Sequence, residues 1–197
     1  FGTHNLIGEE LGENQDILDV GCNDGYLKLL AKKNNFYGID ADANVLEKAI
    51  SNGYEKIFKI NLQNDFTSFK AEKKFDVIVF ADILEHLMFP EKVLSFFMQN
   101  YLKENGSIII SLPNVAHLSV RARLLWGDFN YTEAGILDKT HLHLYTSKTA
   151  KNMMEKCGLK VIRKKFSSNK FGLLIKKIPI LGDILGYNLI FICQKKY

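Results

Sequence analysis

The sequence predicts an α/β protein with a doubly wound parallel sheet, and three observations lead to this fold class. Short apolar segments alternate with segments of helical spacing between Ile17 and Leu112, which is typical of parallel strands joined by right-handed crossover helices. The segment Phe75–Ala81 is almost continuously apolar, as expected for a central strand covered on both faces. Polar residues follow the expected strands where each one ends, and such sheets bind ligands at those ends.

Composition places the chain among ordinary globular proteins. Its 197 residues are 47% hydrophobic and 24% charged, and neither a repeat nor a low-complexity linker divides them, so we expect a single domain over residues 1–197. The net charge of +4 comes from lysines scattered along the chain. A nucleic-acid-binding protein has a denser basic stripe, so we expect no nucleic-acid partner.

The cysteines and the apolar segments indicate the cellular compartment in which we expect the protein. Cys22, Cys157 and Cys193 lie far apart in the sequence, which argues against a zinc site or a disulfide framework and favours a reducing cytoplasm. No apolar run approaches the roughly 18 to 20 residues that span a bilayer, and no signal-peptide pattern precedes the domain. The chain begins at Phe1, so a preceding domain remains an option.

The first half of the chain supplies three expected strands. A short helix over Thr3–Leu11 precedes a strand over Ile17–Val20 and a helix over Tyr26–Lys33. The remaining elements of this half follow in order: strand Phe36–Asp40, a helix capped by Asp42 and ended by Asn52-Gly53, and strand Ile57–Ile60.

The second half begins with the two most apolar strands. Strand Phe75–Ala81 is followed by a helix from Pro90 to about Leu102 and by strand Ser107–Leu112. Later elements are expected as follows: a helix over His117–Trp126, a loop over Gly127–Thr140, a helix from Ser147 to Cys157-Gly158, and strands Leu159–Arg163 and Leu189–Gln194. Between the last two strands, Lys170–Gly186 interleaves apolar residues with lysines. We expect a hairpin-like lid or a homodimer contact there, with an interfacial membrane anchor as the alternative.

The turn Gly21-Cys22-Asn23-Asp24-Gly25 is the chain's main ligand-binding signal. A strand, a glycine turn and a helix N-terminus form a nucleotide-sized pocket because glycine leaves the backbone bare and the helix offers unpaired N–H groups. The spacing departs from the G-x-G-x-x-G of nicotinamide enzymes. Asp19 and Asp24 would repel a pyrophosphate and attract a cation. Asp40, about 20 residues further on, suits ribose hydroxyls in either class of enzyme.

These motifs together resemble class I S-adenosylmethionine-dependent methyltransferases, and more closely the small-molecule branch that includes the ubiquinone-biosynthesis O-methyltransferases. The segments that carry the resemblance are Asp19–Gly25, Asp40, Phe75–Ile78 leading into Asp82-x-x-Glu85-His86, and Leu102-Lys103-x-x-Gly106. The resemblance implies a Rossmann-like seven-stranded sheet of order 3-2-1-4-5-7-6 with an antiparallel last strand. It is strong over Gln15–Leu112 and weak elsewhere.

The resemblance also implies a set of donor-binding residues. The turn residues Asp19, Gly21, Cys22, Asn23 and Gly25 would form the pocket for the methionine part of S-adenosyl-L-methionine, whose product is S-adenosyl-L-homocysteine. The other implied contacts are Asp40 with the ribose, Ala41 with the adenine, Asn61-Leu62 near the adenine amino group, and Ala81 beside the methionine end. Asn23 stands where relatives usually have a glycine, and Asn61 where they usually have an acid.

Methyl transfer from a sulfonium is an in-line displacement that needs a base for the acceptor's proton, and histidine suits that task near neutral pH. His141 and His86 are the candidate bases, ahead of His117, and a purely structural role remains an option for each. The region of about 114–146 is expected to cover the acceptor, with Asn114, Arg121 and Tyr145 as binding residues. We interpret the acids Asp82, Glu85 and Asp138 as strand-end caps and orienting groups, and we expect no metal.

The function predicted from the sequence is therefore methyl transfer to an oxygen of a small-molecule acceptor. Three alternatives remain open: transfer to nitrogen or carbon, a catalytically inactive protein that binds the donor, and, more distantly, a nicotinamide reductase.

Overall fold

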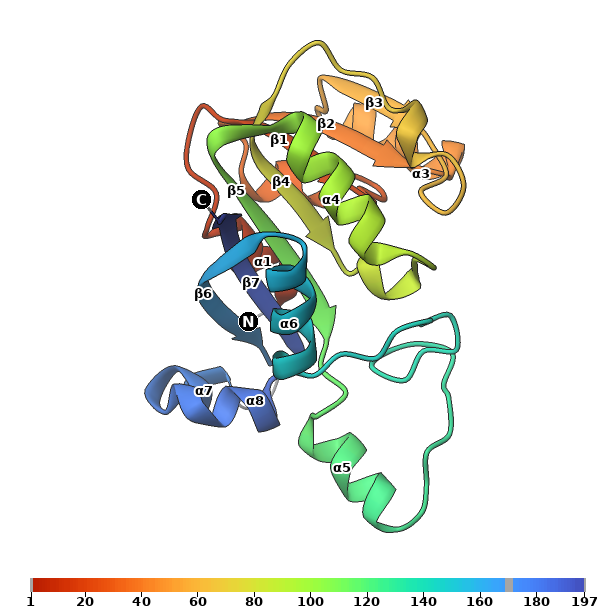
Figure 1. The fold of residues 1–197 in the computed structure, drawn as a ribbon, viewed down its shortest axis with the longest axis vertical. Coiled ribbons are helices and arrows are strands. Elements are labelled where there is room, and N and C mark those ends of the chain that lie inside the picture. The colour runs from red at the N-terminus through yellow and green to blue at the C-terminus, as the bar shows by residue number, and fades with distance from the viewer. Residues whose placement is uncertain (1, 169–171, 197) are drawn as a thin grey trace.

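The computed structural model describes residues 2–168 and 172–196, and within them seven strands form one sheet of order β3-β2-β1-β4-β5-β7-β6 (Figure 1). β1 to β5 are parallel, and β7 is antiparallel to both β5 and β6. The predicted fold class, strand order and antiparallel last strand are confirmed. The strands are β1 Asp16–Val20, β2 Asn35–Asp40, β3 Lys56–Lys59, β4 Phe75–Ala81, β5 Leu102–Pro113, β6 Leu159–Ser167 and β7 Asn188–Lys195.

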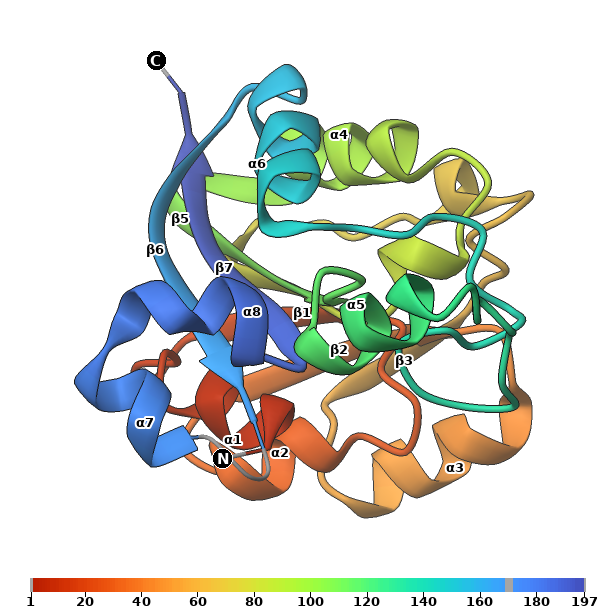
Figure 2. The same ribbon diagram turned by 90° about the horizontal axis from the view of Figure 1, so that it is seen from below.

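Helices cover both faces of the sheet (Figure 2). α1 to α3 pack on one face and α4 and α6 on the other, while α5, α7 and α8 lie at the end where β4 and β5 finish (Figure 1). The helices are α1 Thr3–Gly8, α2 Tyr26–Leu30, α3 Ala43–Ser51, α4 Pro90–Tyr101, α5 Leu118–Leu125, α6 Ser147–Lys156, α7 Gly172–Lys177 and α8 Gly182–Leu185, with 3-10 turns η1 Phe66–Ser68, η2 Leu84–His86 and η3 Pro179–Leu181.

β4 is apolar along its length because it is buried on both faces. Val77 and Val79 pack into the apolar cluster beneath α1 to α3. Ile78 and Phe80 belong to the larger cluster beneath α4 and α6, where the Phe80 ring centroid lies 6.1 Å from that of Phe97. Period-2 alternation of side chains therefore sends consecutive residues of this strand into two different cores.

Local signals fix several helix ends. The side chain of Asp42 accepts a hydrogen bond of 2.9 Å from the backbone N–H of Asn44 at the start of α3, and Gly53 follows the helix with φ of 97°. Thr146 and Thr149 form a reciprocal capping box at the start of α6. These side chains satisfy backbone groups that the first helical turn leaves unpaired.

Other element bounds differ from those expected. α1 ends at Gly8 because the next amides, Glu10 and Leu11, bond three residues back and turn the chain out of the helix. α2 stops at Leu30, since Ala31 takes a non-helical conformation with φ of −129°. β5 begins at Leu102, well before Ser107, because an irregularity in the ladder pairs Leu102 with Phe75.

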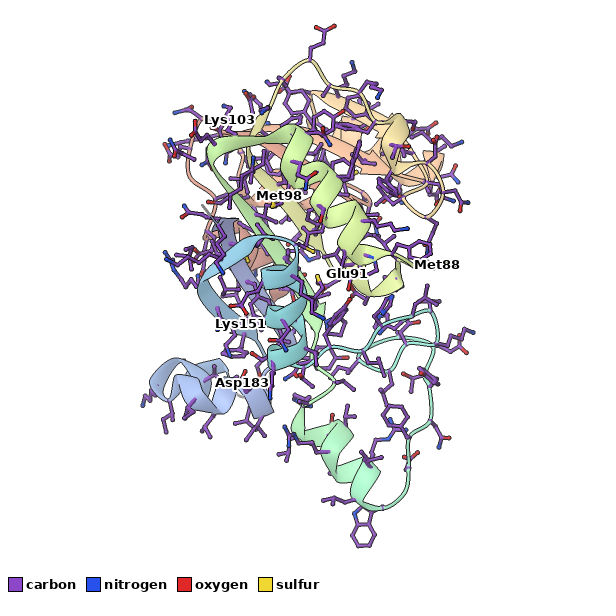
Figure 3. The ribbon with its side chains drawn as sticks, viewed as in Figure 1. Met88, Glu91, Met98, Lys103, Lys151 and Asp183 are labelled. Atoms are coloured by element: carbon purple, nitrogen blue, oxygen red, sulfur yellow. The ribbon has the colours of Figure 1, made fainter. Side chains whose placement is uncertain are left out.

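The segment between β6 and β7 is helical, and the hairpin expected there was wrong. Lys170 and Phe171 lie outside the described residues, and α7, η3 and α8 follow them. Asp183 on α8, labelled in Figure 3, forms an ion pair with Lys164 on β6, with 2.7 Å between Oδ1 and Nζ. None of the helices within residues 2–168 and 172–196 has the length and apolarity that a bilayer crossing requires.

Because the sheet has a core on each face, shortening a buried side chain is expected to lower the free energy of unfolding more than shortening an exposed one. Leu94 on α4 is fully buried, whereas Leu125 at the end of α5 is 86% exposed. Leu94→Ala leaves a cavity and is expected to lower the free energy of unfolding by about 2–5 kcal/mol. Leu125→Ala is the matched control, with an expected change within about 0.5 kcal/mol. Urea unfolding of both variants measures this, and equal losses would contradict the packing described.

Candidate active site

Hydrogen bonds hold the turn after β1 against the end of β2. The backbone N–H groups of Gly21 and Cys22 both donate to the carbonyl of Ile39, at 2.8 and 3.0 Å, and that of Asn23 donates to Oδ2 of Asp40 at 3.0 Å. Gly21 has φ of 80° and Asn23 has φ of 48°. Asparagine is among the few residues that tolerate this left-handed region, so Asn23 can take this conformation without being a glycine.

A cavity of about 440 Å³, here called the turn cavity, opens over this turn. Its walls come from α1, the β1 turn, the end of β2 and the end of β4. The lining residues are His4, Asp19, Gly21, Cys22, Asn23, Asp24, Tyr26, Leu27, Asp40, Ala81, Asp82, Ile83 and His86. They include six of the ten residues that the sequence assigned to the donor: Asp19, Gly21, Cys22, Asn23, Asp40 and Ala81.

The other four, Gly25, Ala41, Asn61 and Leu62, lie outside this lining. Gly25 supports the turn from behind, where a Cβ would come within 3 Å of Ala49 and Tyr54. Leu62 is buried in the core. The side chain of Asn61 accepts a hydrogen bond of 2.9 Å from the backbone of Gln63. Asn61 and Leu62 therefore serve the turn after β3 in this structure.

Asp19 is a buried acid with incomplete partners. It is 2% exposed, and its Oδ2 accepts a hydrogen bond of 2.6 Å from the hydroxyl of Tyr54. Its Oδ1 has no hydrogen-bond partner among the described residues. Burial raises the pKa of Asp19 to about 7, with a further contribution from Asp40. A cation bound in the turn cavity would therefore stabilise the ionised form of this carboxyl.

A second cavity of about 360 Å³, here called the histidine cavity, adjoins the first. Its lining residues are Gly2, Thr3, His4, Asp82, Glu85, His86, Pro113, Gly135, Asp138, His141, Ser167, Tyr187 and Asn188. His4, Asp82 and His86 line both cavities. A molecule in one cavity would therefore face a molecule in the other across these three residues.

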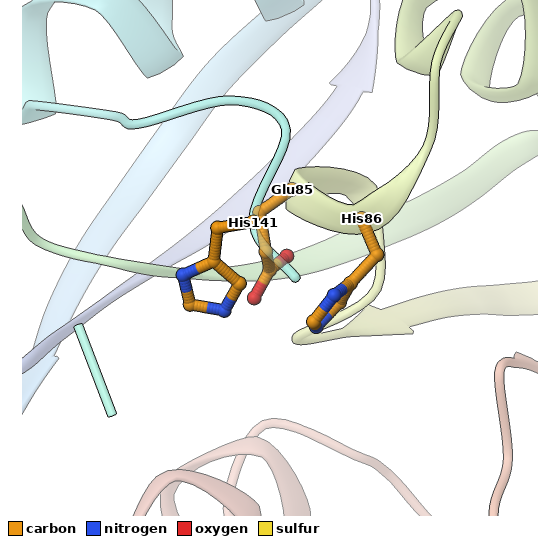
Figure 4. Close-up of side chains that lie close together, drawn as sticks. All are labelled: Glu85, His86 and His141. Carbon is orange, nitrogen blue, oxygen red and sulfur yellow. The ribbon is translucent and has the colours of Figure 1, made fainter. Parts of the chain in front are cut away.

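Glu85, His86 and His141 gather in the histidine cavity, and Figure 4 shows the Glu85 carboxylate between the two imidazole rings. One ligand atom of each residue lies within 4.8 Å of those of the other two. Glu85 is 1% exposed, and neither carboxylate oxygen has a hydrogen-bond partner within the described part of the chain. Burial, with repulsion from Asp82, raises the pKa of Glu85 to about 9. The strand-end cap expected of Glu85 is therefore not what its side chain does.

Backbone oxygens orient both imidazoles. Nδ1 of His141 lies 3.1 Å from the carbonyl oxygen of Ile136, and Nδ1 of His86 lies 3.3 Å from the carbonyl oxygen of Thr140. A carbonyl only accepts, so in each ring Nδ1 is assigned the proton and Nε2 keeps a lone pair. Burial lowers the pKa of His86, and the neighbouring His141 lowers it further. The imidazole of His86 is thus suited to act in its neutral form.

Asp82 and Asp138 do orient other groups. Oδ1 of Asp82 accepts hydrogen bonds of 2.7 Å from Ser111 and from Asn188, while its own backbone is held at φ of 50°. Oδ1 of Asp138 accepts from the hydroxyl and the backbone N–H of Thr140, at 2.7 and 2.8 Å. That hydroxyl lies 3.1 Å from Nδ1 of His86.

The three residues expected to bind the acceptor line neither cavity. Asn114 is fully buried, and its side-chain amide bonds the carbonyls of Asp183 and Gly186 at the foot of β7. The guanidinium of Arg121 bonds the carbonyl of Ala116 beside its own helix, and Tyr145 is part of the core. Their proposed contact with the acceptor stays a prediction.

Residues that were not predicted as site residues line these cavities. His4 on α1 lines both cavities, and Tyr187 and Asn188 at the start of β7 line the histidine cavity. The sequence indicates a surface role for His4 and gives no signal for Tyr187. The position of Asn188 at the cavity follows from the antiparallel pairing of β7, which sets it opposite Pro113 and Ser167. The sequence alone does not predict this register.

Asp19 predicts a pH dependence of stability. Its pKa is raised from 3.8 to about 7 in the folded chain, so between these values the folded state holds this proton and the unfolded state does not. The free energy of unfolding therefore falls as pH rises from about 4 to about 7, by a contribution of the order of 4 kcal/mol. Asp19→Asn removes this contribution, and urea unfolding across that range would show a shallower slope than in wild type. Asp65→Asn, at an exposed acid, is the control; equal slopes in Asp19→Asn and wild type would contradict the assignment.

Comparison with known proteins places this geometry in a family. Residues 2–164 match a protein-family profile described as "Methyltransferase domain". Ubiquinone biosynthesis O-methyltransferase of Rickettsia canadensis is 36% identical over 104 residues, which cover 50% of this chain and 43% of that protein. Ribosomal protein L11 methyltransferase of Thermosipho melanesiensis is 32% identical over 109 residues, 54% of this chain and 41% of that protein. The chain thus spans less than half the length of these curated relatives.

Solved structures share the fold over most of their length. A possible histamine N-methyltransferase from Thermotoga maritima, described as SAM-dependent, superimposes with a TM-score of 0.69 at 14% identity, covering 98% of this chain and 88% of that one. The N-methyltransferase NodS of Bradyrhizobium japonicum, solved with S-adenosyl-L-homocysteine, gives a TM-score of 0.61 at 15% identity and covers 94% and 80%. With the profile match over most of its length, this chain belongs to the methyltransferase-domain family.

Proposed function

We propose that the protein is an S-adenosyl-L-methionine-dependent methyltransferase that transfers the methyl group to an oxygen of a small-molecule acceptor. The observation that carries this proposal is the pair of adjoining cavities, which share Asp82 and His86. Methyl transfer requires donor and acceptor to be in line and in contact. Two cavities with a common wall provide such an arrangement.

The turn cavity suits the donor. Asp19, Asp24 and Asp40 line it, and carboxylates favour the sulfonium and the ammonium of S-adenosyl-L-methionine over an anionic ligand. Asp40 accepts from the amides of Asn23 and Asp42, at 3.0 and 3.1 Å, and each carboxylate oxygen can accept a second bond. The ribose hydroxyls are the partners that we assign to those remaining positions.

The histidine cavity suits the acceptor. Its volume of about 360 Å³ lies in the range of small-molecule sites. The Nε2 atoms of His86 and His141 carry the lone pairs that would act on an acceptor hydroxyl. Sulfur receives the electron pair of the broken S–CH3 bond, and oxygen forms the new bond to the methyl group and loses its proton. A protein is the second candidate acceptor, because several relatives are named as methyltransferases of ribosomal protein L11.

A reducing compartment such as the cytoplasm is part of this proposal, because Cys22, Cys157 and Cys193 are all free thiols. Oxidation of the buried Cys22, which lines the turn cavity, would change the proposed donor site.

Calorimetry with S-adenosyl-L-homocysteine tests the donor site. The wild-type chain is expected to bind it, and Asp40→Ala is expected to weaken binding by about 1–3 kcal/mol through the lost hydrogen bonds to a charged group. Asp65→Ala, outside both cavities, is expected to bind like wild type. No binding by wild type at millimolar ligand would refute the proposed function.

His141→Ala separates chemistry from donor binding. His141 lines only the histidine cavity, so S-adenosyl-L-homocysteine affinity is expected to stay at the wild-type value. Turnover, measured as S-adenosyl-L-homocysteine release with an acceptor found by screening small hydroxyl compounds, is expected to fall by about 10²–10⁴-fold. His143→Ala, at a histidine outside both cavities, is the control. Unchanged turnover in His141→Ala would remove this residue from the mechanism.

A further inference from the structure

The side chains of Glu85, His86 and His141 present a set of metal-ligand atoms toward one point of the histidine cavity. One atom from each lies within 4.8 Å of the other two, and the imidazole ring centroids are 4.8 Å apart. Two imidazoles and one carboxylate, with the open cavity on the remaining side, form a donor set used by divalent transition metals. Such sets leave coordination positions free for another ligand.

The hydrogen bonds of the two imidazoles use Nδ1 of each ring and leave Nε2 able to bind a metal ion. Nδ1 of His141 faces the Ile136 carbonyl and Nδ1 of His86 faces the Thr140 carbonyl, so the remaining lone pair of each ring is on Nε2. Metal-binding histidines commonly donate their second ring N–H to a backbone carbonyl or a carboxylate, which fixes the ring and its tautomer. For His86 the hydroxyl of Thr140 adds a link to Asp138.

The burial of Glu85 without a hydrogen-bond partner among the described residues is an independent observation that favours a bound cation. Its side chain is 99% buried, with a relative exposure of 1%, and both carboxylate oxygens lack hydrogen-bond partners within residues 2–168 and 172–196. Neither lysine nor arginine is among the described residues that line the cavity into which it points. A buried carboxylate is normally paired, hydrogen-bonded or coordinated to a metal, and the described part of the chain supplies Glu85 with neither of the first two.

The backbone around the cluster is built to hold these groups together. The carbonyl of Glu85 accepts from the amides of Leu142 and His143, at 2.9 and 3.1 Å, which ties η2 to the loop that carries His141. On the other side, the side chain of Gln63 donates to the carbonyl of His86 at 2.6 Å and accepts from the amide of Met88 at 2.8 Å. Residues 54 positions apart, His86 and Thr140, are thereby held in contact.

We propose that Glu85, His86 and His141 bind one divalent transition-metal ion, of the zinc, cobalt or iron(II) class, at the boundary between the two cavities. Two nitrogen ligands disfavour calcium and magnesium, which prefer oxygen. Metal–ligand bonds of about 2.0–2.2 Å place ligand atoms roughly 3.0–3.6 Å apart, so the three side chains need to close by about 1 Å.

The role of the ion in catalysis rests on the proposed function. The acceptor binds the ion through its hydroxyl oxygen, and the ion's charge favours loss of the hydroxyl proton to solvent water. The oxygen then attacks the donor's methyl carbon, an O–CH3 bond forms, and the S–CH3 bond breaks with its electron pair going to sulfur. The ion is unchanged, and the products are the methyl ether, S-adenosyl-L-homocysteine and a proton. With the ion bound, the two imidazoles would act on the hydroxyl through the ion, in place of the direct proton transfer to Nε2 that is open to them without it.

Metal titration of the full chain tests this site without any acceptor. After dialysis against EDTA, wild type is titrated with Co²⁺ by visible absorption and with Zn²⁺ by calorimetry, and thermal unfolding is followed in the same samples. We expect one equivalent of ion to bind and the melting temperature to rise. The variants Glu85→Gln, which keeps the shape of the side chain, and His141→Ala are expected to bind about 10-fold to 100-fold more weakly or worse. His143→Ala is expected to bind like wild type.

Two results would overturn the metal site: no saturable binding of either ion at millimolar concentration, or equal affinity in wild type and Glu85→Gln. The same samples are titrated with S-adenosyl-L-homocysteine. Donor binding without metal binding refutes this inference and leaves the proposed function standing. Metal binding without donor binding supports the ion site and refutes the proposed function.

Discussion

Burial of β1 and β4 on both faces is the constraint on which both cavities depend. Because the two strands are parallel and paired along their length, their carboxyl ends reach the same edge of the sheet. Asp19 near the end of β1, Gly21 in the turn that follows it, and Asp82 directly after β4 therefore lie at one edge of the sheet. Weakening the core beneath α4 would loosen this edge, so the packing described for the fold is also what sets the distance between the proposed donor and acceptor.

The site keeps groups that a purely structural core would avoid. Asp19 and Glu85 are buried acids with unpartnered oxygens, and burial raises the pKa of each. Asp82 has a left-handed backbone conformation that is uncommon outside glycine. Unfavourable burial and local strain concentrate at functional sites because ligands compensate for them. The sulfonium donor is the compensating charge that we propose for Asp19, and a divalent ion is the one that we propose for Glu85.

The sequence was informative where function follows from local order. Strand ends, the glycine turn, Asp19 and Asp40 could be located because parallel strands bring their carboxyl ends together, and this rule needs no tertiary detail. Asn61 and Leu62 lie outside the turn cavity, because the chain turns after β3 with Leu62 in the core and Asn61 bonded to Gln63; their contact with the adenine stays a prediction. No local pattern indicates that Asn114 bonds the carbonyls of Asp183 and Gly186 or that Tyr145 packs in the core; the role of these two residues and of Arg121 in acceptor binding stays a prediction. The positions of His4 and Tyr187 at the cavities, and the lack of a hydrogen-bond partner for Glu85 among the described residues, depend on contacts between segments far apart in the sequence. A local sequence pattern does not predict such contacts.

The central claim is that one cavity holds the donor and directs its methyl group into the other. A crystal structure of the chain with S-adenosyl-L-homocysteine tests this most directly. We predict that the ribose hydroxyls lie at Asp40, the amino-acid part over the Asp19–Gly25 segment, and the thioether sulfur at the Asp82–His86 wall facing the histidine cavity. A ligand bound outside the turn cavity, or a sulfur directed away from His86, would contradict it.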